Sequence, residues 1–271
     1  MIGTAVAYDE SMSFVAAEWL PKALLALVVS LALQVGVNYA NDYSDGVRGT
    51  DDDRAGPMRL VASQRATPRA VKTAAFAAFG VACMAGLVLA LLTTWWLVAL
   101  GVVCVVAAWT YTGGPRPYGY AGLGEVFVFV FFGLVATAGT TYVIVESVSE
   151  LAMLSGVLAG LLAVALLMVN NIRDIDGDSR SGKRTLAVRL GSERSKNLFT
   201  LVYVAAFGVV IAAATQSLGA LLGFAGLLAA LPAISTVREA TTAPRLIAAL
   251  GMTARTQLVV GTCYALGLVI Q

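Results

Sequence analysis

Acidic and amide side chains gather at two places in a chain that otherwise carries little charge. The first group is Asn38, Asn41, Asp42 and Asp45, with Asp51 following it. On a helix that turns about 100° per residue, the first four side chains fall within an arc of roughly 100°. Gly46 and Gly49 then favour a break in the helix. We therefore expect one polar face at a helix end, with Asp51 folding back toward it.

The second group lies about half a chain later. It consists of Asn170, Asn171, Asp174, Asp176 and Asp178. Asn170, Asp174 and Asp178 are spaced four residues apart, and this spacing predicts a single stripe along a helix. Asp176 points away from the stripe and is expected to be solvated or to pair within a loop.

Carboxylate and amide oxygens are the ligands of hard divalent cations, and Mg²⁺ commonly shares its coordination shell with substrate phosphates. Basic residues that can clamp phosphate oxygens follow each group: Arg48, Arg54, Arg59, Lys183 and Arg184. Together the acids and bases predict a metal-bridged diphosphate site. A simpler role stays open for each group, because Asp and Asn followed by Gly also cap helices and turn the chain. Each basic residue could equally serve only to orient the chain in a membrane.

A membrane is the solvent that the rest of the chain favours. Of its 271 residues, 59% are hydrophobic and 13% are charged, and the mean hydropathy is +0.82. Eight apolar runs are each about long enough to cross a bilayer, which takes roughly 20 helical residues: 19–40, 70–92, 94–112, 120–145, 150–172, 197–215, 217–236 and 246–270. Segment 1–8 is too short to cross and does not resemble a signal peptide. We expect it to be the tail of a ninth helix whose beginning is missing.

The positions of the basic residues predict the orientation of the helices. Loops 45–72, 113–118, 173–196 and 237–255 hold 17 of the 18 lysines and arginines, and Lys22 alone lies on the opposite side. Cytoplasmic loops retain positive charge, so this face is predicted to be cytoplasmic. Segments 9–18, 93–94, 146–150 and 215–219 are then outside. A net charge of +2 does not indicate a nucleic-acid partner.

Several classes of chemistry are excluded. The chain has no histidine, which rules out imidazole bases, Ser-His-Asp triads and zinc sites of the histidine type. Its three cysteines lie in separate apolar runs and are expected to be packing residues. A cation-coupled transporter stays open as the less favoured alternative, because it would need polar residues deeper in the membrane, whereas these acids gather at one face. The spacing of the two acidic groups also suggests an internal duplication, with halves 1–145 and 146–271, within one domain.

A third polar segment, 111–120, is rich in glycine, proline and tyrosine. Tyr111 and Arg116 are its leading candidates for contact with a substrate, although a plain turn between helices would look similar. Glu125, near the start of an apolar run, is a further candidate because acids within membranes are costly. It could equally accept hydrogen bonds from neighbouring groups.

At these residues the chain resembles the UbiA superfamily of membrane prenyltransferases. Asn41-Asp42-x-x-Asp45 with Asp51 is similar to the first signature of that family, and Asp174-x-x-x-Asp178 is similar to the second. Asp51 comes two residues later than the strict first signature requires. Segments 37–46, 56–61, 111–125 and 183–191 resemble more narrowly the members that prenylate 1,4-dihydroxy-2-naphthoate in menaquinone biosynthesis, as found in actinobacteria. The likeness extends from about residue 20 to the carboxyl terminus.

The resemblance implies an all-α integral membrane protein, a bundle of about nine transmembrane helices around a central cavity. It also implies a Mg²⁺-dependent site, with two ions. The implied metal ligands are Asn41, Asp42, Asp45, Asp51, Asn170, Asp174 and Asp178, of which Asn41, Asp45, Asp174 and Asp178 form the catalytic set. The implied diphosphate-binding residues are Arg48, Arg59, Arg116, Arg173, Lys183 and Arg184. The residues that could contact the acceptor or stabilise an allylic cation are Tyr39, Trp109, Tyr111, Tyr118 and Glu125.

The reaction that the resemblance implies is transfer of a polyprenyl group from polyprenyl diphosphate to 1,4-dihydroxy-2-naphthoate. Carbon dioxide and diphosphate would leave, and demethylmenaquinol would form, at the cytoplasmic side of a bacterial cell membrane. Other acceptors of the superfamily stay open, namely 4-hydroxybenzoate, haem, a chlorophyllide or a glycerol phosphate.

Overall fold

The computed structural model describes residues 1–11, 15–50, 56 and 58–270. All regular elements among these residues are helices and none is a strand, which confirms the predicted all-α class. Asp51 and Arg54 lie outside the described residues. The contacts divide the chain into two compact units. Unit 1 comprises Met1–Trp19, Glu125–Arg173 and Leu190–Gln271, and unit 2 comprises Leu20–Gly124 and Asp174–Arg189.

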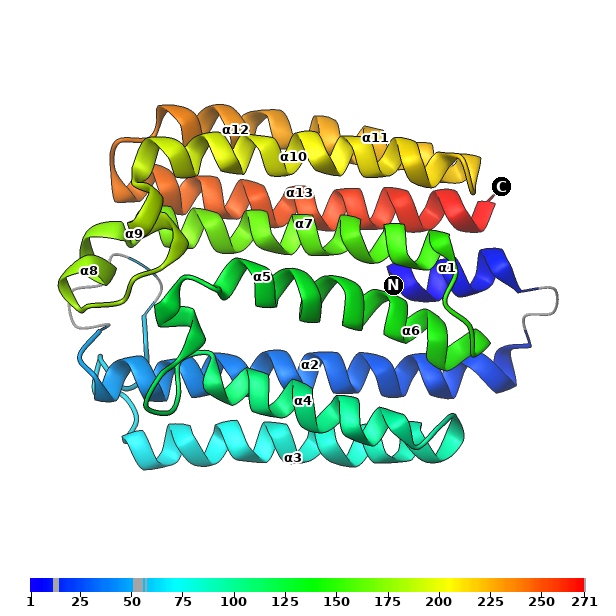
Figure 1. Cartoon of the computed structure of the whole chain (residues 1–271), viewed down its shortest axis with the longest axis horizontal. Helices are drawn as coiled ribbons and strands as arrows, with labels where there is room; N and C mark the ends of the chain where they lie inside the picture. Colours follow the sequence, from blue (N-terminus) through cyan, green and yellow to red (C-terminus); the bar gives the residue numbers. More distant parts are fainter. Residues whose placement is uncertain (12–14, 51–55, 57, 271) are drawn as a thin grey trace. The chain divides into compact units, whose positions relative to one another are not determined.

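Unit 1 holds most of the long apolar helices (Figure 1). Its elements are α1 (Ile2–Glu10), α5 (Gly124–Val128), the π-helical segment η2 (Phe129–Val135), α6 (Ala136–Val145), α7 (Glu150–Arg173), α10 (Ser192–Ala214), the 3₁₀ segment η3 (Leu218–Leu222), α11 (Gly223–Leu228), α12 (Ala230–Glu239) and α13 (Ala243–Ile270). Most of the buried side chains in these elements are apolar.

Helix α7 packs against α10, α13 and η2 within unit 1. Small residues allow the approach to η2, since a Cβ atom added to Gly133 would lie 2.5 Å from the Cα atom of Gly160. A buried hydrogen bond of 2.8 Å joins the hydroxyls of Ser155 and Tyr264 and so ties α7 to α13. Helix α7 is thereby fixed up to Arg173, where unit 1 gives way to the second acidic group.

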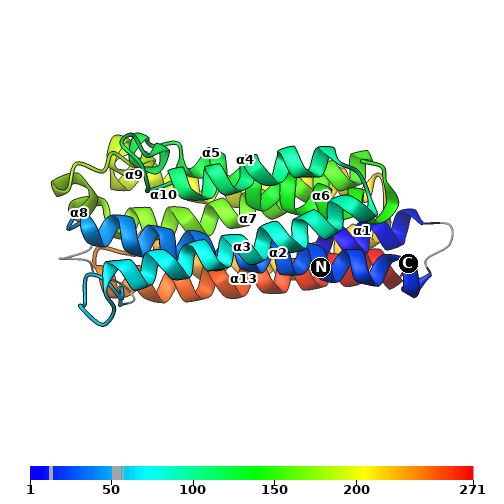
Figure 2. The same cartoon turned by 90° about the horizontal axis from the view of Figure 1, so that it is seen from below.

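Unit 2 contains most of α2 (Ala16–Val47), together with α3, α4 and three short elements. Their bounds are Pro68–Leu92 for α3, Trp96–Thr110 for α4, Tyr118–Ala121 for the 3₁₀ segment η1, Ile175–Arg180 for α8 and Leu186–Leu190 for α9. Thr67 caps α3 by accepting a hydrogen bond of 3.2 Å from the Ala70 amide. Helices α3 and α4 contact each other, and in Figure 2 they converge toward the ends that residues 93–95 connect.

The core of unit 2 lies where α2 meets α3. Ala40, Ala75 and Phe79 are buried there, and Tyr39 and Trp109 pack against them. Gly36 leaves room for Phe79, because a Cβ atom at Gly36 would lie 2.5 Å from the ring. Helix α2 is therefore held against α3 around Gly36 and Ala40, shortly before its polar carboxyl-terminal end.

Among the described residues, six helices are long and apolar enough to cross a membrane, and a bent pair brings the number up to seven. The pair is Leu218–Leu228 with Ala230–Glu239, bent by 41°. The expected span 94–112 is a shorter apolar helix, Trp96–Thr110. Each of the eight predicted apolar runs thus corresponds to helix, and the chain is a multi-pass membrane protein, but the count of about nine spans stays a prediction.

The three segments predicted to be outside in unit 1 meet through hydrogen bonds. The Ser149 hydroxyl donates to Glu10 at the end of α1. The Gln216 amide donates to Glu150 at 3.1 Å, and the Ser217 hydroxyl donates to Asp9 at 3.4 Å. Asp9 and Glu10 consequently lie at the same end of this unit as segments 146–150 and 215–219.

Candidate functional site

The carboxyl-terminal end of α2 presents the first acidic group. The helix continues to Val47, and Gly49 then adopts a left-handed conformation with φ of +74°. The amide of Thr50 donates to the carbonyl of Asp45 at 3.0 Å, so the chain turns back at this point. The predicted break after the first group is therefore present. The return of Asp51 falls outside the described residues and stays a prediction.

Asp42 anchors the loop around residues 60 and 61 by hydrogen bonds. Both of its carboxylate oxygens accept backbone hydrogen bonds, from the amide of Leu60 at 2.8 Å and from that of Val61 at 2.9 Å. Gly46 allows this loop to approach, since a Cβ atom there would lie 2.6 Å from the side chain of Val61. Asp42 is buried, and its bonds hold the segment that carries Arg59 against the end of α2.

The second acidic group begins where α7 ends. The single stripe expected from Asn170 to Asp178 is interrupted, because the backbone at Asp174 leaves helical geometry with φ of −95° and ψ of 6°. Helix α8 then starts at Ile175, and the amide of Asp178 donates to the carbonyl of Asp174 at 2.8 Å. Asp178 is buried, whereas Asp176 is exposed, and the exposure of Asp176 agrees with its expected solvation. Asn170 belongs to unit 1, whereas Asp174 and Asp178 belong to unit 2.

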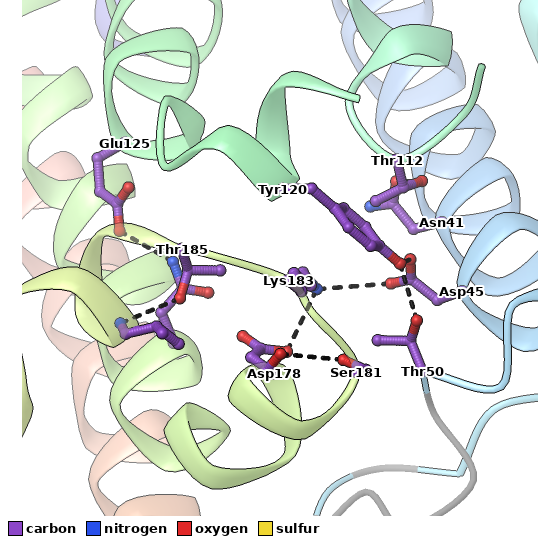
Figure 3. Close-up of polar contacts among 12 residues, drawn as sticks. Asn41, Asp45, Thr50, Thr112, Tyr120, Glu125, Asp178, Ser181, Lys183 and Thr185 are labelled. Atoms are coloured by element: carbon purple, nitrogen blue, oxygen red, sulfur yellow. Dashed lines mark hydrogen bonds and ion pairs between the residues drawn. The ribbon is translucent and has the colours of Figure 1, made fainter. Parts of the chain in front are cut away.

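Lys183 joins the two acidic groups (Figure 3). Its ammonium nitrogen lies 3.6 Å from a carboxylate oxygen of Asp45 and 3.6 Å from one of Asp178. The side chains of the two acids are 4% and 7% exposed, and that of Lys183 is 15% exposed. Two carboxylates from distant parts of the sequence thus converge on one cation in a largely buried position.

Tyr120 is the third element of this cluster. Its hydroxyl donates to Asp45 at 2.8 Å and lies 2.8 Å from the hydroxyl of Thr50. Its ring lies beneath two cations, with the Arg48 guanidinium 5.2 Å and the Lys183 ammonium 5.5 Å from its centre. The carbonyl of Tyr120 also accepts a hydrogen bond of 3.0 Å from the amide of Arg184. Segment 111–120 is therefore part of the site.

Asn41 and Arg48 fasten the same segment to α2. The amide oxygen of Asn41 accepts a hydrogen bond of 2.8 Å from the hydroxyl of Thr112. The Arg48 guanidinium donates to the carbonyls of Thr112 and Gly114. These contacts turn Arg48, a predicted diphosphate-binding residue, toward backbone carbonyls.

The electrostatics of the cluster favour a charged lysine and a neutral tyrosine. Burial lowers the pKa of the Lys183 ammonium, but Asp45 and Asp178 outweigh burial, so that this pKa lies above its ordinary value. Burial raises the pKa of the Tyr120 phenol, and the neighbouring Asp45 carboxylate raises it further. Tyr120 consequently keeps its proton, and its neutral hydroxyl donates a hydrogen bond to Asp45.

The remaining basic candidates differ in their surroundings. Arg116 and Arg184 are exposed in unit 2, and Arg59 is half-buried there. Arg173 is buried at the end of α7 in unit 1. Exposed guanidinium groups next to the acidic cluster remain available in principle to a phosphate, and their role stays a prediction.

The residues predicted to contact the acceptor or to stabilise an allylic cation also lie in different environments. Tyr39 and Trp109 pack in the core between α2, α3 and α4. Tyr111 and Tyr118 stack edge to face with ring centres 5.4 Å apart, and the hydroxyl of Tyr118 donates to the carbonyl of Ala107 at 2.9 Å. In unit 1, Glu125 is buried and accepts a hydrogen bond of 2.9 Å from the side-chain amide of Asn171.

The side chains of the cluster offer oxygen atoms, which are the type of ligand that a divalent cation such as Mg²⁺ prefers. Asp45 and Asp178 already converge on a positive charge, and Asn41 supplies an amide oxygen at the same helix end. Within the described ranges, no three acidic, cysteine or histidine side chains converge as a ready set of ligands. The Lys183 ammonium instead lies between the two carboxylates.

Reasoning from the sequence missed Tyr120, Thr112 and Thr50. Tyr120 lies in the segment that was singled out, but Tyr111 and Tyr118 were preferred there. Three tyrosines in a loop rich in glycine and proline offer no periodicity that could rank them. The hydroxyls of Thr50 and Thr112 carry no signal in the sequence that separates them from ordinary turn residues.

Comparison with known proteins agrees with the helical architecture. The UbiA prenyltransferase family matches residues 1–267 of the chain. Over 189 residues, the chain is 56% identical to the 1,4-dihydroxy-2-naphthoate octaprenyltransferase of Mycobacterium tuberculosis, covering 68% of this chain and 65% of that protein. The chain thus spans just under two thirds of the length of that relative. The Mycobacterium leprae enzyme of the same name is 49% identical over 225 residues, covering 83% of this chain and 76% of that protein.

A solved structure shows the same fold. It is a UbiA homologue from Archaeoglobus fulgidus bound to DMAPP and Mg²⁺, and it superposes with a TM-score of 0.66 at 14% identity. The superposition covers 99% of this chain and 93% of that chain.

Proposed function

Because the chain belongs to the UbiA prenyltransferase family, we propose that it transfers a polyprenyl group from polyprenyl diphosphate to 1,4-dihydroxy-2-naphthoate. The allylic carbon–oxygen bond to diphosphate breaks, and a carbon–carbon bond forms at the ring carbon that carries the carboxylate. Carbon dioxide and diphosphate leave, and demethylmenaquinol results. The observation that carries the proposal is the convergence of Asp45 and Asp178, one from each acidic group, on a single cation.

Mg²⁺ is the cofactor of the proposed reaction, and a homologous fold has been solved with Mg²⁺ and DMAPP. Bound at this cluster, it supplies Lewis-acid and electrostatic stabilisation of the negative charge on diphosphate. Asn41, Asp45, Asp174 and Asp178 would hold it, with two ions as in the sequence-based expectation. Asp42 is better described as a loop anchor, because both of its oxygens bind backbone amides.

Side chains of the protein bind the diphosphate, orient Asp45 and exclude water. Lys183 offers its ammonium to a phosphate oxygen, and Arg59, Arg116 and Arg184 offer guanidinium groups on the same unit. Tyr120 orients Asp45 through its hydroxyl, and Arg48 holds the segment that carries Tyr120. Apolar walls keep water from the allylic cation in a chain that is 59% hydrophobic.

The acceptor is proposed from the names of the relatives. Both mycobacterial proteins act on 1,4-dihydroxy-2-naphthoate according to their names, and they are 56% and 49% identical to this chain. We place the reaction at the cytoplasmic side of a bacterial cell membrane, because Asp45, Asp178 and Lys183 lie in segments that are rich in lysine and arginine.

The test is a competition between acceptors. Purified protein with Mg²⁺ and radiolabelled polyprenyl diphosphate receives either 1,4-dihydroxy-2-naphthoate or 4-hydroxybenzoate. We expect label to enter the naphthoate product alone, with release of one carbon dioxide per transfer and loss of turnover in EDTA. Prenylation of hydroxybenzoate, and none of the naphthoate, would assign the protein to another acceptor class.

The acidic residues are tested by neutral substitutions of the same size. Asp45→Asn or Asp174→Asn should lower Mg²⁺-dependent transfer by roughly a hundredfold or more, because each removes a carboxylate charge that a cation needs. Asp176→Asn is the matched control, since Asp176 is exposed on the neighbouring helix α8, and it should retain most of the activity. Transfer at the wild-type rate in either of the first two variants would refute the ligand assignment.

A further inference from the structure

We propose that the Lys183 ammonium occupies the position between the Asp45 and Asp178 carboxylates. It prevents a divalent cation from binding there until a diphosphate attracts the ammonium away. Metal and diphosphate would then bind as a pair, rather than metal first. This inference rests on the proposed function, because it assumes that a diphosphate enters this cluster.

The distances support a shared cation. The two nitrogen–oxygen separations are both 3.6 Å, longer than the 2.7–2.9 Å typical of a charge-assisted hydrogen bond. Lys183 is therefore committed to neither carboxylate alone. Burial makes the arrangement necessary, because two carboxylates that are 4% and 7% exposed would repel each other without a cation between them.

The backbone fixes where the ammonium can reach. The amide of Lys183 donates to the carbonyl of Asp178 at 2.8 Å, and Gly182 turns the chain with φ of +75°. The side chain then extends past the ring of Tyr120 to Asp45. Lysine is suited to exchange between partners, because its compact charge sits on a flexible stem.

A bound diphosphate would compete with Asp45 and Asp178 for the Lys183 ammonium. Its oxygens carry more negative charge than a single carboxylate and are accessible to a flexible ammonium. Once Lys183 turns to a phosphate oxygen, Asp45 and Asp178 are left with uncompensated charge that a divalent cation can neutralise. Binding of either ligand then strengthens binding of the other by the same factor, as linkage requires.

The test measures metal binding without turnover. Mn²⁺ replaces Mg²⁺ as the probe, and free Mn²⁺ is followed by electron paramagnetic resonance with purified protein in the absence of any diphosphate. Lys183→Met should bind Mn²⁺ roughly tenfold more tightly than wild type or better, because the competing charge is gone. Lys183→Arg, which retains the charge, should remain as weak as wild type.

Arg180→Met is the matched control. It removes one positive charge from exposed helix α8, close in sequence to Lys183, and it should leave Mn²⁺ affinity unchanged. A gain of affinity in this variant equal to that of Lys183→Met would mean that net charge, rather than the position of Lys183, controls metal binding, and would overturn the inference.

Wild-type protein supplies a second measurement that needs no substitution. Mn²⁺ and inorganic pyrophosphate should each bind roughly tenfold more tightly in the presence of the other. Equal Mn²⁺ affinity with and without pyrophosphate overturns the inference, as does a folded Lys183→Met that gains no affinity. Reciprocal binding without naphthoate prenylation would leave the inference standing and reject the proposed acceptor.

Discussion

At the scale of single residues, the hydroxyl of Tyr120 is the contact that links segment 111–120 to the acidic cluster. Tyr120→Phe keeps the ring beneath Arg48 and Lys183 but removes the hydrogen bonds to Asp45 and Thr50. A hydrogen bond to a charged group contributes about 1.5–3 kcal/mol. We expect kcat/KM for prenyl transfer to fall roughly tenfold, because Asp45 is no longer oriented by this hydrogen bond.

Tyr43→Phe is the control for this substitution. Tyr43 lies on the same end of α2, and its ring stacks with Trp109 at a centre-to-centre distance of 6.2 Å. Since the ring remains, kcat/KM should stay close to wild type. If Tyr120→Phe also turned over at the wild-type rate, its hydroxyl would have no part in positioning the acid.

Asp42 is expected to affect stability before chemistry. Asp42→Asn leaves one oxygen for the two amides of Leu60 and Val61 and turns an N–H group toward the other amide. The loss of a buried acceptor should cost about 1–3 kcal/mol of unfolding free energy. Thermal unfolding in detergent measures the cost, and exposed Asp176→Asn should change stability by less than about 0.5 kcal/mol. Equal midpoints for the two variants would remove the anchoring role.

Residue types and spacing predicted the acidic residues of the cluster better than the groups that contact them. Asp45 and Asp178 stand out because charge is costly in an apolar chain, and both lie in the cluster. Tyr120 was missed because its importance depends on where a glycine- and proline-rich segment folds. The two oxygens of Asp42 were assigned to metal, although their distance to the amides of a loop 18 residues later decides their use. Contacts of this range leave no periodic trace in a sequence.

At the scale of elements, hydropathy predicted helices well and their interruptions poorly. Each of the eight apolar runs corresponds to helix, because length and polarity fix which segments a membrane accepts. The break at Asp174, the bend in 218–239 and the short length of Trp96–Thr110 were not predicted. At Asp174 no glycine or proline marks the change, and a regular four-residue spacing concealed it.

Packing between α2 and α3 yields the prediction at this scale. In Gly36→Ala the new Cβ atom would lie 2.5 Å from the Phe79 ring, which is buried against Ala40 and Ala75. We expect a loss of about 1–3 kcal/mol of unfolding free energy from overpacking. Thermal unfolding of the purified protein, followed by tryptophan fluorescence, measures it.

Gly80→Ala is the matched control on α3. A Cβ atom there would meet nothing within 4 Å, and alanine favours the helix by about 0.5–1 kcal/mol. The two glycines should therefore shift the midpoint in opposite directions. A similar shift for both would show that Gly36 is not a packing site.

At the scale of the whole molecule, charge and hydrogen bonding agree on the orientation of the chain. In unit 1, Asp9 and Glu10 are hydrogen-bonded to residues of segments 146–150 and 215–219, and none of these segments holds a basic residue. In unit 2, Arg48 contacts the carbonyl of Gly114 in segment 113–118, and Lys183 contacts Asp45. Within each unit, the loops that contact one another are thus loops that the charge rule assigns to the same side of the membrane.

Cysteine labelling decides the orientation. Ser147 and Thr241 are exposed hydroxyl residues of unit 1, in loops predicted to lie outside and in the cytoplasm respectively. With Cys83, Cys104 and Cys263 replaced by alanine, Ser147→Cys should react with a membrane-impermeant maleimide on intact cells. Thr241→Cys should react only after the membrane is opened, because positively charged loops are retained in the cytoplasm. The reverse pattern would place the acidic cluster outside the cell, away from a cytoplasmic supply of diphosphate, and would contradict the proposed site of reaction. Labelling of both loops from one side would instead require an even number of crossings between residues 147 and 241, against the three crossings, α7, α10 and the bent pair, with which the charge rule was applied.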